Sequence, residues 1–217
     1  MALATYTDLQ SSVANWLHRS DSNLIAAIPD FITLCEARYE HEFNGLWSQM
    51  TTATGTTAAN DTSFALPDDF KRIYRLTVTQ SGTDYEVEYS AADDIAKYNN
   101  QSGVPLKYAL INQQGWWLPK PDGVYTYTIF YYAKFPSLGP SSASNWLLAN
   151  APDVYLYGTL LEAAPFMKDQ AMTVLWKQAF ESAVAGVIND DEQVRKPGGV
   201  LVIRSDQYSR SRGGISV

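Results

Sequence analysis

The chain has 217 residues, of which 46% are hydrophobic and 13% aromatic, enough to build the core of one large domain or of a domain with an insert. Its net charge of -7 is unevenly distributed: residues 193–217 hold five basic residues and one acidic residue, a net charge of +4, so residues 1–192 carry -11. An acidic body with a basic tail argues against nucleic-acid binding by the body and suggests that the tail docks on an acidic partner. The single cysteine, Cys35, excludes an internal disulfide.

Two helices are predicted near the N-terminus. A capping box that begins at Thr7 starts the first, which we expect to run to about residue 18 because apolar side chains recur on one face. A polar turn at 19–23 separates it from the second, which has Pro29 in its first turn and Gly45 at its end.

The middle of the chain is predicted to be rich in β-structure, because apolar and polar residues alternate there. Residues 51–63 have no helical period and are compatible with a strand or a loop. Ser81 and Gly82 form a hairpin turn, and a short helix is expected over residues 90–98. The predicted strands are residues 71–80, 85–89, 106–111, 115–119 and 124–133.

Residues 145–167 predict a central helix. They are apolar on almost every side, so the helix must be covered on all sides, and it is too short to span a bilayer. Asn150 suits its N-cap, Pro152 its first turn, and Pro165 its end. A capping residue at Asp169 then starts a long helix that runs to about residue 192.

These elements predict an α+β fold in which a four-helix bundle carries an inserted antiparallel β-meander and an extended C-terminal tail. The bundle takes its N-terminal helices from residues 1–62 and its C-terminal helices from residues 136–195. The β-meander and a short helix occupy residues 63–135, and a flexible tail occupies residues 196–217.

The chemistry of an enzyme is not evident in the sequence. No phosphate-binding, nucleophile-elbow or zinc-protease motif is present, and the two histidines, His18 and His41, have no second metal ligand at suitable spacing. We therefore expect no catalytic residue, no metal and no cofactor. Because no apolar run reaches eighteen residues and no basic-then-apolar leader opens the chain, we also expect no membrane span and no signal peptide.

Two aromatic pairs in the predicted strands suggest a binding surface. Neighbours in a strand point to opposite faces, so one member of Trp116–Trp117 and one member of Tyr131–Tyr132 must face solvent, another element or a partner. Such an aromatic side chain serves equally well as a contact with another subunit or tail protein and as a stacking platform for carbohydrate or a receptor. The sequence leaves both alternatives open.

Several short motifs, taken in order, closely resemble the head-to-tail adaptor, or connector, proteins of tailed bacteriophages and related prophages. The resemblance covers roughly residues 5–195, and it is densest in residues 145–166. The other matching motifs are Ile28-Pro-Asp-Phe-Ile, Glu36-Ala-Arg, Leu66-Pro-Asp-Asp-Phe and Pro119-Lys-Pro-Asp-Gly followed by a tyrosine-rich strand.

The resemblance implies a structural virion protein and not an enzyme. Such adaptors are made in the host cytoplasm and form a ring, commonly of about twelve copies, at the head–tail junction. The ring joins the portal protein to tail or nozzle proteins, and DNA passes through it without sequence-specific binding. No membrane is involved.

The resemblance also implies that the C-terminal segment extends to clasp the portal. The basic tail has an apolar run at Val200–Ile203, which can order by adding a strand to a partner, although a solvated tail is an equal expectation for the isolated protein. The residues expected to bind the portal are Arg195, Lys196, Val200, Leu201, Val202, Ile203, Arg204, Tyr208, Arg210 and Arg212.

Overall fold

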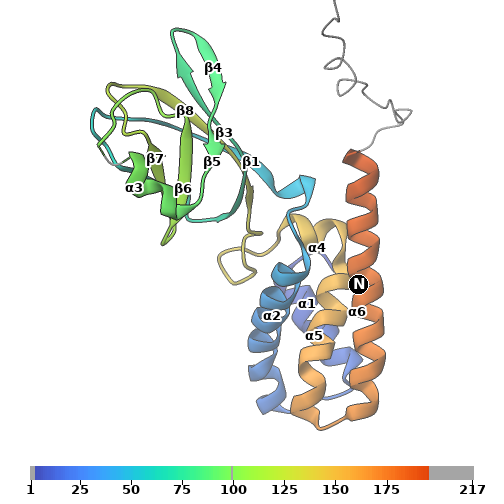
Figure 1. Ribbon diagram of the computed structural model, residues 1–217. Helices are drawn as coiled ribbons and strands as arrows, with labels where there is room; N and C mark the ends of the chain where they lie inside the picture. The colour runs from blue at the N-terminus through green and yellow to red at the C-terminus, as the bar shows by residue number, and fades with distance from the viewer. Residues whose placement is uncertain (1–2, 99, 196–217) are drawn as a thin grey trace, which may run out of the picture.

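The computed structural model describes residues 3–98 and 100–195, which form a helical lobe and a β lobe (Figure 1). The chain enters the β lobe after the second helix and returns to the helical lobe before the fourth. The helices of the helical lobe are α1 (Tyr6–Trp16), α2 (Ser22–Glu42), α4 (Trp146–Asn150), α5 (Pro152–Met167) and α6 (Gln170–Arg195).

Helix α5 is the centre of the helical lobe, as its apolar composition predicts. Its Val154, Tyr155 and Leu160 have no exposed surface, and α1, α2, α4 and α6 all pack against it. Gly158 allows two neighbouring helices to come close, because a Cβ atom there would collide with the Cys35 sulfur on α2 and press on Phe180 of α6.

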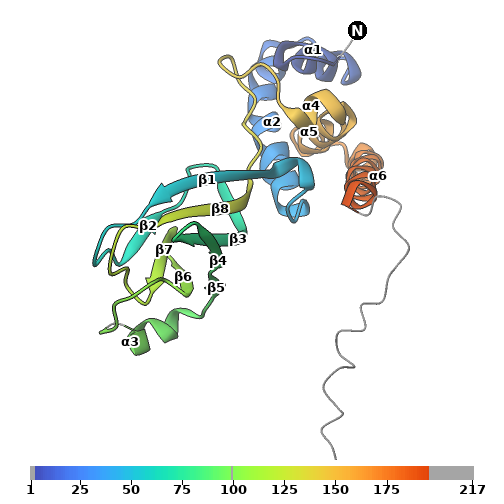
Figure 2. The same cartoon turned by 90° about the horizontal axis from the view of Figure 1, so that it is seen from above.

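The predicted four-helix bundle is wrong. Residues 3–98 and 100–195 form six α-helices and two sheets of four strands each, a mixed α+β fold. Figures 1 and 2 show α2 and α6 on opposite sides of α5, so the long helices form a layer with α5 in the middle and do not surround a shared axis. A helix that is apolar all round can be covered in a layer or in a bundle, and the sequence pattern does not distinguish these two arrangements.

The helix boundaries differ from the predicted ones where the prediction rested on a capping residue or on a proline. The capping box of α1 uses Thr5 and Asp8. Asp21 caps α2, which contains Pro29 in its interior. Pro165 likewise lies inside α5, which ends at the left-handed residue Lys168.

The β lobe contains two sheets that pack face to face. Figure 2 shows the first sheet, with strand order β1–β8–β3–β4, running out from the end of α2. The second sheet has the order β2–β7–β6–β5, and a 3-10 turn and the short helix α3 (Ile95–Tyr98) lie beside it. The strands are β1 (Met50–Thr56), β2 (Ser63–Ala65), β3 (Phe70–Gln80), β4 (Thr83–Glu86), β5 (Glu88–Tyr89), β6 (Lys107–Ile111), β7 (Gln114–Leu118) and β8 (Thr126–Ala133).

The single antiparallel meander predicted for this region is also wrong, because β5 pairs with β6 in parallel. The predicted strand at 85–89 is divided between the two sheets at Val87, which is buried, whereas Tyr85 and Tyr89 on either side are exposed. Residues 50–56 form a strand, which settles the alternative left open for this threonine-rich stretch.

The core of the β lobe lies between the sheets and is separate from that of the helical lobe. Leu76 and Ile129 come from the first sheet, and Phe64 and Trp117 from the second. Four of the buried residues of this core are aromatic: Phe64, Tyr108, Trp117 and Tyr131. The rings of Phe64 and Trp117 pack against each other, with 4.2 Å between their centroids.

A buried polar network attaches the returning loop, residues 134–145, to α2. Glu36 accepts hydrogen bonds from the Leu138 backbone N–H (2.7 Å) and from the Tyr155 hydroxyl (3.1 Å), and Tyr155 accepts one from Tyr39 (2.8 Å). Asn145 donates to Tyr155 and to the Pro136 carbonyl. Burial raises the pKa values of Glu36, Tyr39 and Tyr155.

Candidate interaction site at the end of α6

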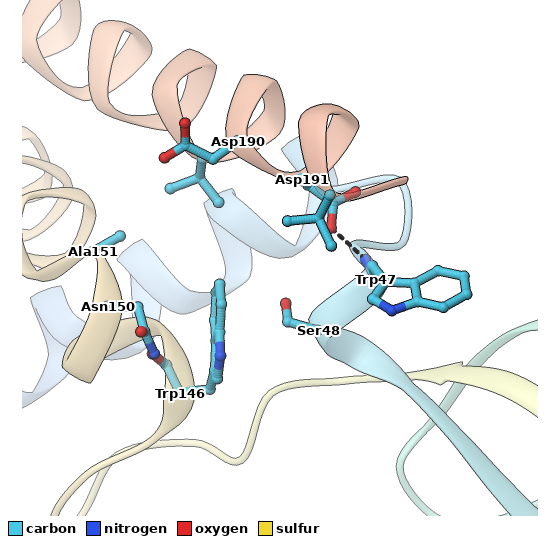
Figure 3. Close-up of a pocket in the computed structure, with 9 residues that line it drawn as sticks. Trp47, Ser48, Trp146, Asn150, Ala151, Asp190 and Asp191 are labelled. Carbon is cyan, nitrogen blue, oxygen red and sulfur yellow. Dashed lines mark hydrogen bonds between the residues drawn. The ribbon is translucent and has the colours of Figure 1, made fainter. Parts of the chain in front are cut away.

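A hollow of about 340 Å³ lies where the helical lobe meets the β lobe. Its walls come from α4, from the C-terminal half of α6, and from the 3-10 helix η1 (Trp47–Gln49) that precedes β1. Figure 3 shows Trp146 and Asp190 on opposite sides of it, with Trp47 and Ser48 at one end. Most of its lining is apolar, which is typical of a surface that binds another protein segment.

Trp146 is held in place by its surroundings although 42% of it is exposed. The preceding residue, Asn145, caps α4 by accepting a hydrogen bond from the Leu148 N–H (2.9 Å). One face of the indole stacks on Phe135, with 5.7 Å between ring centroids and an angle of 3° between the planes. The ring is therefore oriented before any partner arrives, which lowers the entropy cost of binding.

Trp47 is fixed through its backbone. Its N–H donates a hydrogen bond to Asp191 of α6, which connects η1 to the last turns of that helix (Figure 3). The Trp47 side chain is 48% exposed. Trp146 thus presents its indole to the hollow, whereas the ring of Trp47 at the end of the hollow points outward (Figure 3).

The end of α6 is anchored by Arg195. Its guanidinium pairs with Asp191 at 2.7 Å, donates to the Gly45 carbonyl, and lies 5.8 Å from the centre of the Tyr132 ring. Arg72 lies over the same ring at 5.0 Å. These contacts connect the base of the C-terminal segment to both lobes.

Gly45 has a specific role in this anchor. Its φ of +89° is a conformation that other residues rarely adopt, and a Cβ atom there would come within 2.8 Å of the Tyr132 ring. A larger residue would displace the ring on which both arginines lie. The sequence predicted Gly45 as a helix end, but α2 ends at Glu42 and the glycine serves this close approach.

A family model described as SU10 adaptor protein matches residues 4–202, most of the chain. The chain belongs to this family. Its members are phage head-to-tail adaptors, so the resemblance predicted from short motifs is confirmed, and the protein has a structural role as a phage adaptor and a virion component. No curated protein matches the chain.

The aromatic pairs predicted as partner contacts of the adaptor occupy different environments. Trp117, Tyr131 and Tyr132 are buried, and Trp116 is partly exposed. Trp117 is only 2% exposed and packs between Phe64 and Tyr127, so it cannot stack on a carbohydrate ring. Burial and a hydrogen bond to Asp69 raise the pKa of Tyr131 to about 12.

Of the tail residues predicted to bind the portal, Arg195 belongs to the described part of the chain, as the last residue of α6. The other nine lie outside the described residues: Lys196, Val200, Leu201, Val202, Ile203, Arg204, Tyr208, Arg210 and Arg212. The structure therefore describes the point where the tail begins and the surface around it.

The described residues offer little for chemistry. Over residues 3–98 and 100–195, no three histidine, cysteine, aspartate or glutamate side chains are grouped so that they could hold a metal ion. Cys35 is fully buried, and burial raises the pKa of its thiol, which disfavours the reactive thiolate. Among the described helices, none is long and apolar enough to cross a membrane.

The hollow itself is not predictable from the sequence pattern. Trp146 lies in the apolar stretch 145–167, whose pattern predicts a core helix, and the adjacent Asp190 and Asp191 carry no pattern that indicates a binding site. One signal for Trp146 was available: Asn145 is a good N-cap, so Trp146 lies in the first turn of a helix, where a side chain can remain partly exposed. Trp47 offered no such signal, since its position depends on a hydrogen bond to a residue 144 positions away.

Proposed function

We propose that the protein forms a ring, of about twelve copies, that joins the portal to tail or nozzle proteins at the head–tail junction and lets DNA pass. The observation that carries this proposal is the family match over residues 4–202. In this account the protein is made in the host cytoplasm, then becomes part of the virion, and it catalyses no reaction.

The charge distribution supports passage of DNA. Residues 1–192 carry a net charge of -11, and an acidic inner surface would not hold the phosphates of passing DNA. We assign portal attachment to the basic C-terminal segment, because its net charge is opposite to that of the body. Arg195 supports this role by fixing the point where the segment leaves both lobes.

A deletion tests the assignment of the tail. The chain without residues 196–217 is expected to keep its circular dichroism spectrum and to lose binding to purified portal rings in a sedimentation assay. A full-length variant in which Arg210 and Arg212 are replaced by glutamate should show the same loss. Normal portal binding by both variants would show that the tail does not attach the adaptor.

A further inference from the structure

The hollow beside Trp146 continues along α6. A second hollow of about 450 Å³ shares Asn150, Ala151, Val187 and Asp190 with the first and extends down to Tyr157 of α5 and Ala179 of α6. We call the two together the α5–α6 groove. From Ala179 to Val194 the α6 wall rises about 22 Å, enough for an extended segment of about six or seven residues.

The wall of this groove contains a glycine that the isolated chain does not need. Gly186 lies in the middle of α6, where a glycine destabilises a helix by about 1 kcal/mol relative to alanine. A Cβ atom built there meets nothing within 4 Å, so packing within the chain does not require it. Together with Ala179, Ser182 and Ala183, it leaves room for a backbone to approach closely.

The charge of the groove is also one-sided. Asp153, Asp190 and Asp191 line it, and none of its described lining residues is basic. Its occupant should therefore be apolar with basic residues on either side. Residues 196–204 have this composition: the apolar run Val200–Ile203 is preceded by Lys196 and followed by Arg204.

We propose that, in the adaptor ring, the α5–α6 groove of each copy binds the tail of the neighbouring copy, with the apolar run Val200–Ile203 inside the groove and the flanking Lys196 and Arg204 at or beyond its ends. This inference rests on the proposed ring. The apolar run packs on Trp146 and Val187. Lys196 and Arg204 pair with Asp153 and Asp190, since Asp191 already pairs with Arg195. A groove and a tail on every copy make a head-to-tail contact that repeats around a closed ring.

The extent of the family match supports this division of the tail. The match continues through residue 202 and so includes most of the apolar run. Residues 203–217 lie beyond it and contain Arg210 and Arg212. In this proposal, contact between copies uses residues 196–204, and portal attachment uses the distal Arg210 and Arg212.

Disulfide trapping tests the contact in the full-length protein. One variant carries Ser182→Cys in the groove and the other Leu201→Cys in the tail; the native Cys35 is buried and should not react. The two are mixed, assembled on portal rings and oxidised. We expect a disulfide-linked dimer on a non-reducing gel, absent when Ser11→Cys on the exposed face of α1 replaces the groove variant.

A blocking variant sharpens the test. Gly186→Leu, introduced into the Ser182→Cys chain, fills the groove and should reduce the cross-linked dimer about tenfold. Ala185→Leu is the matched control, because residue 185 is exposed on the same helix but does not line the groove, and it should leave the yield unchanged.

Electron micrographs of the same samples separate the two proposals. Rings on the portal without the specific cross-link would overturn the groove assignment and leave the proposed ring intact. Absence of rings would overturn the proposed function and this inference together.

Discussion

The helical lobe and the β lobe bury their side chains in different ways. The helical lobe covers one apolar helix, α5, with helices on several sides, and its outermost helix, α6, keeps Val174, Leu175 and Val194 exposed. The β lobe buries Phe64, Tyr108, Trp117 and Tyr131 between two sheets. Exposed apolar side chains occur in both lobes, but among the described residues only those at the seam, Trp47, Trp146 and Val194, line the hollow where an adaptor can meet a neighbour.

The largest expected effect compares the same substitution in the two cores. Leu160 and Leu76 have no exposed surface, and Leu160 lies in the larger core. Leu160→Ala should lower the free energy of unfolding by about 4 kcal/mol and Leu76→Ala by about 3 kcal/mol, because the larger core collapses less readily onto a cavity. Urea unfolding followed by circular dichroism measures both, and a greater loss in Leu76→Ala would contradict the difference between the cores.

Two glycines sharpen the contrast between the centre and the edge of the helical lobe. Gly158→Ala places a methyl group against Cys35 and Phe180 and should destabilise the protein by about 1–3 kcal/mol. Gly186→Ala points into open space and should stabilise the isolated chain by about 1 kcal/mol through helix propensity. Thermal unfolding of the two variants in parallel measures both effects. Two shifts of the melting temperature in the same direction would contradict the prediction.

The network under the returning loop predicts a pH effect. Burial raises the pKa of Glu36 above its ordinary value of 4.5, so the native state holds this proton more tightly than the unfolded state. The associated stability is present below pH 4.5 and is lost as the pH rises through the raised pKa. As the pH rises from 4.5 through the raised pKa of Glu36, the free energy of unfolding of the wild type should therefore fall relative to that of Glu36→Gln, which does not titrate. If the difference in unfolding free energy between the two proteins stayed constant over this pH range, Glu36 would not be the source of the pH dependence.

The smallest expected effect concerns the anchor of α6. The Arg195–Asp191 pair is partly exposed, so Arg195→Ala should change the free energy of unfolding by less than about 1 kcal/mol. Faster hydrogen exchange in the last turn of α6 should accompany it, because the contacts with Gly45 and Tyr132 are lost. Arg19→Ala, which removes an exposed pair at the start of α2, is the control and should leave exchange in α6 unchanged.

The sequence predicts the local elements of both lobes well, because periodicity is a local signal. The strands at 106–111, 115–119 and 124–133, the hairpin turn at Ser81–Gly82, and the central apolar helix all appear in the structure near their predicted positions. The arrangement of these elements was not predictable in the same way. Nothing in the alternation at 85–89 indicates that Val87 is the point where the chain passes from one sheet to the other.

The candidate site was less predictable than the fold, for a related reason. In the Trp116–Trp117 pair, one side chain is buried and the other is partly exposed, as alternation in a strand predicts. In the Tyr131–Tyr132 pair, both side chains are buried, because Gly45 and two arginines cover the outer face of β8. The groove depends on contacts between distant segments, such as Trp47 with Asp191. Only the basic and apolar segment 196–204, which we propose as its partner, is recognisable as a pattern in the sequence.

Electron cryomicroscopy of the complete phage particle tests the central claim most directly. The account predicts a closed ring of this chain beneath the portal, into which the two lobes described above fit, with density for a neighbour's tail segment in the α5–α6 groove. A particle in which the portal vertex lacks this chain, or carries it only as single copies away from the DNA channel, would contradict the account.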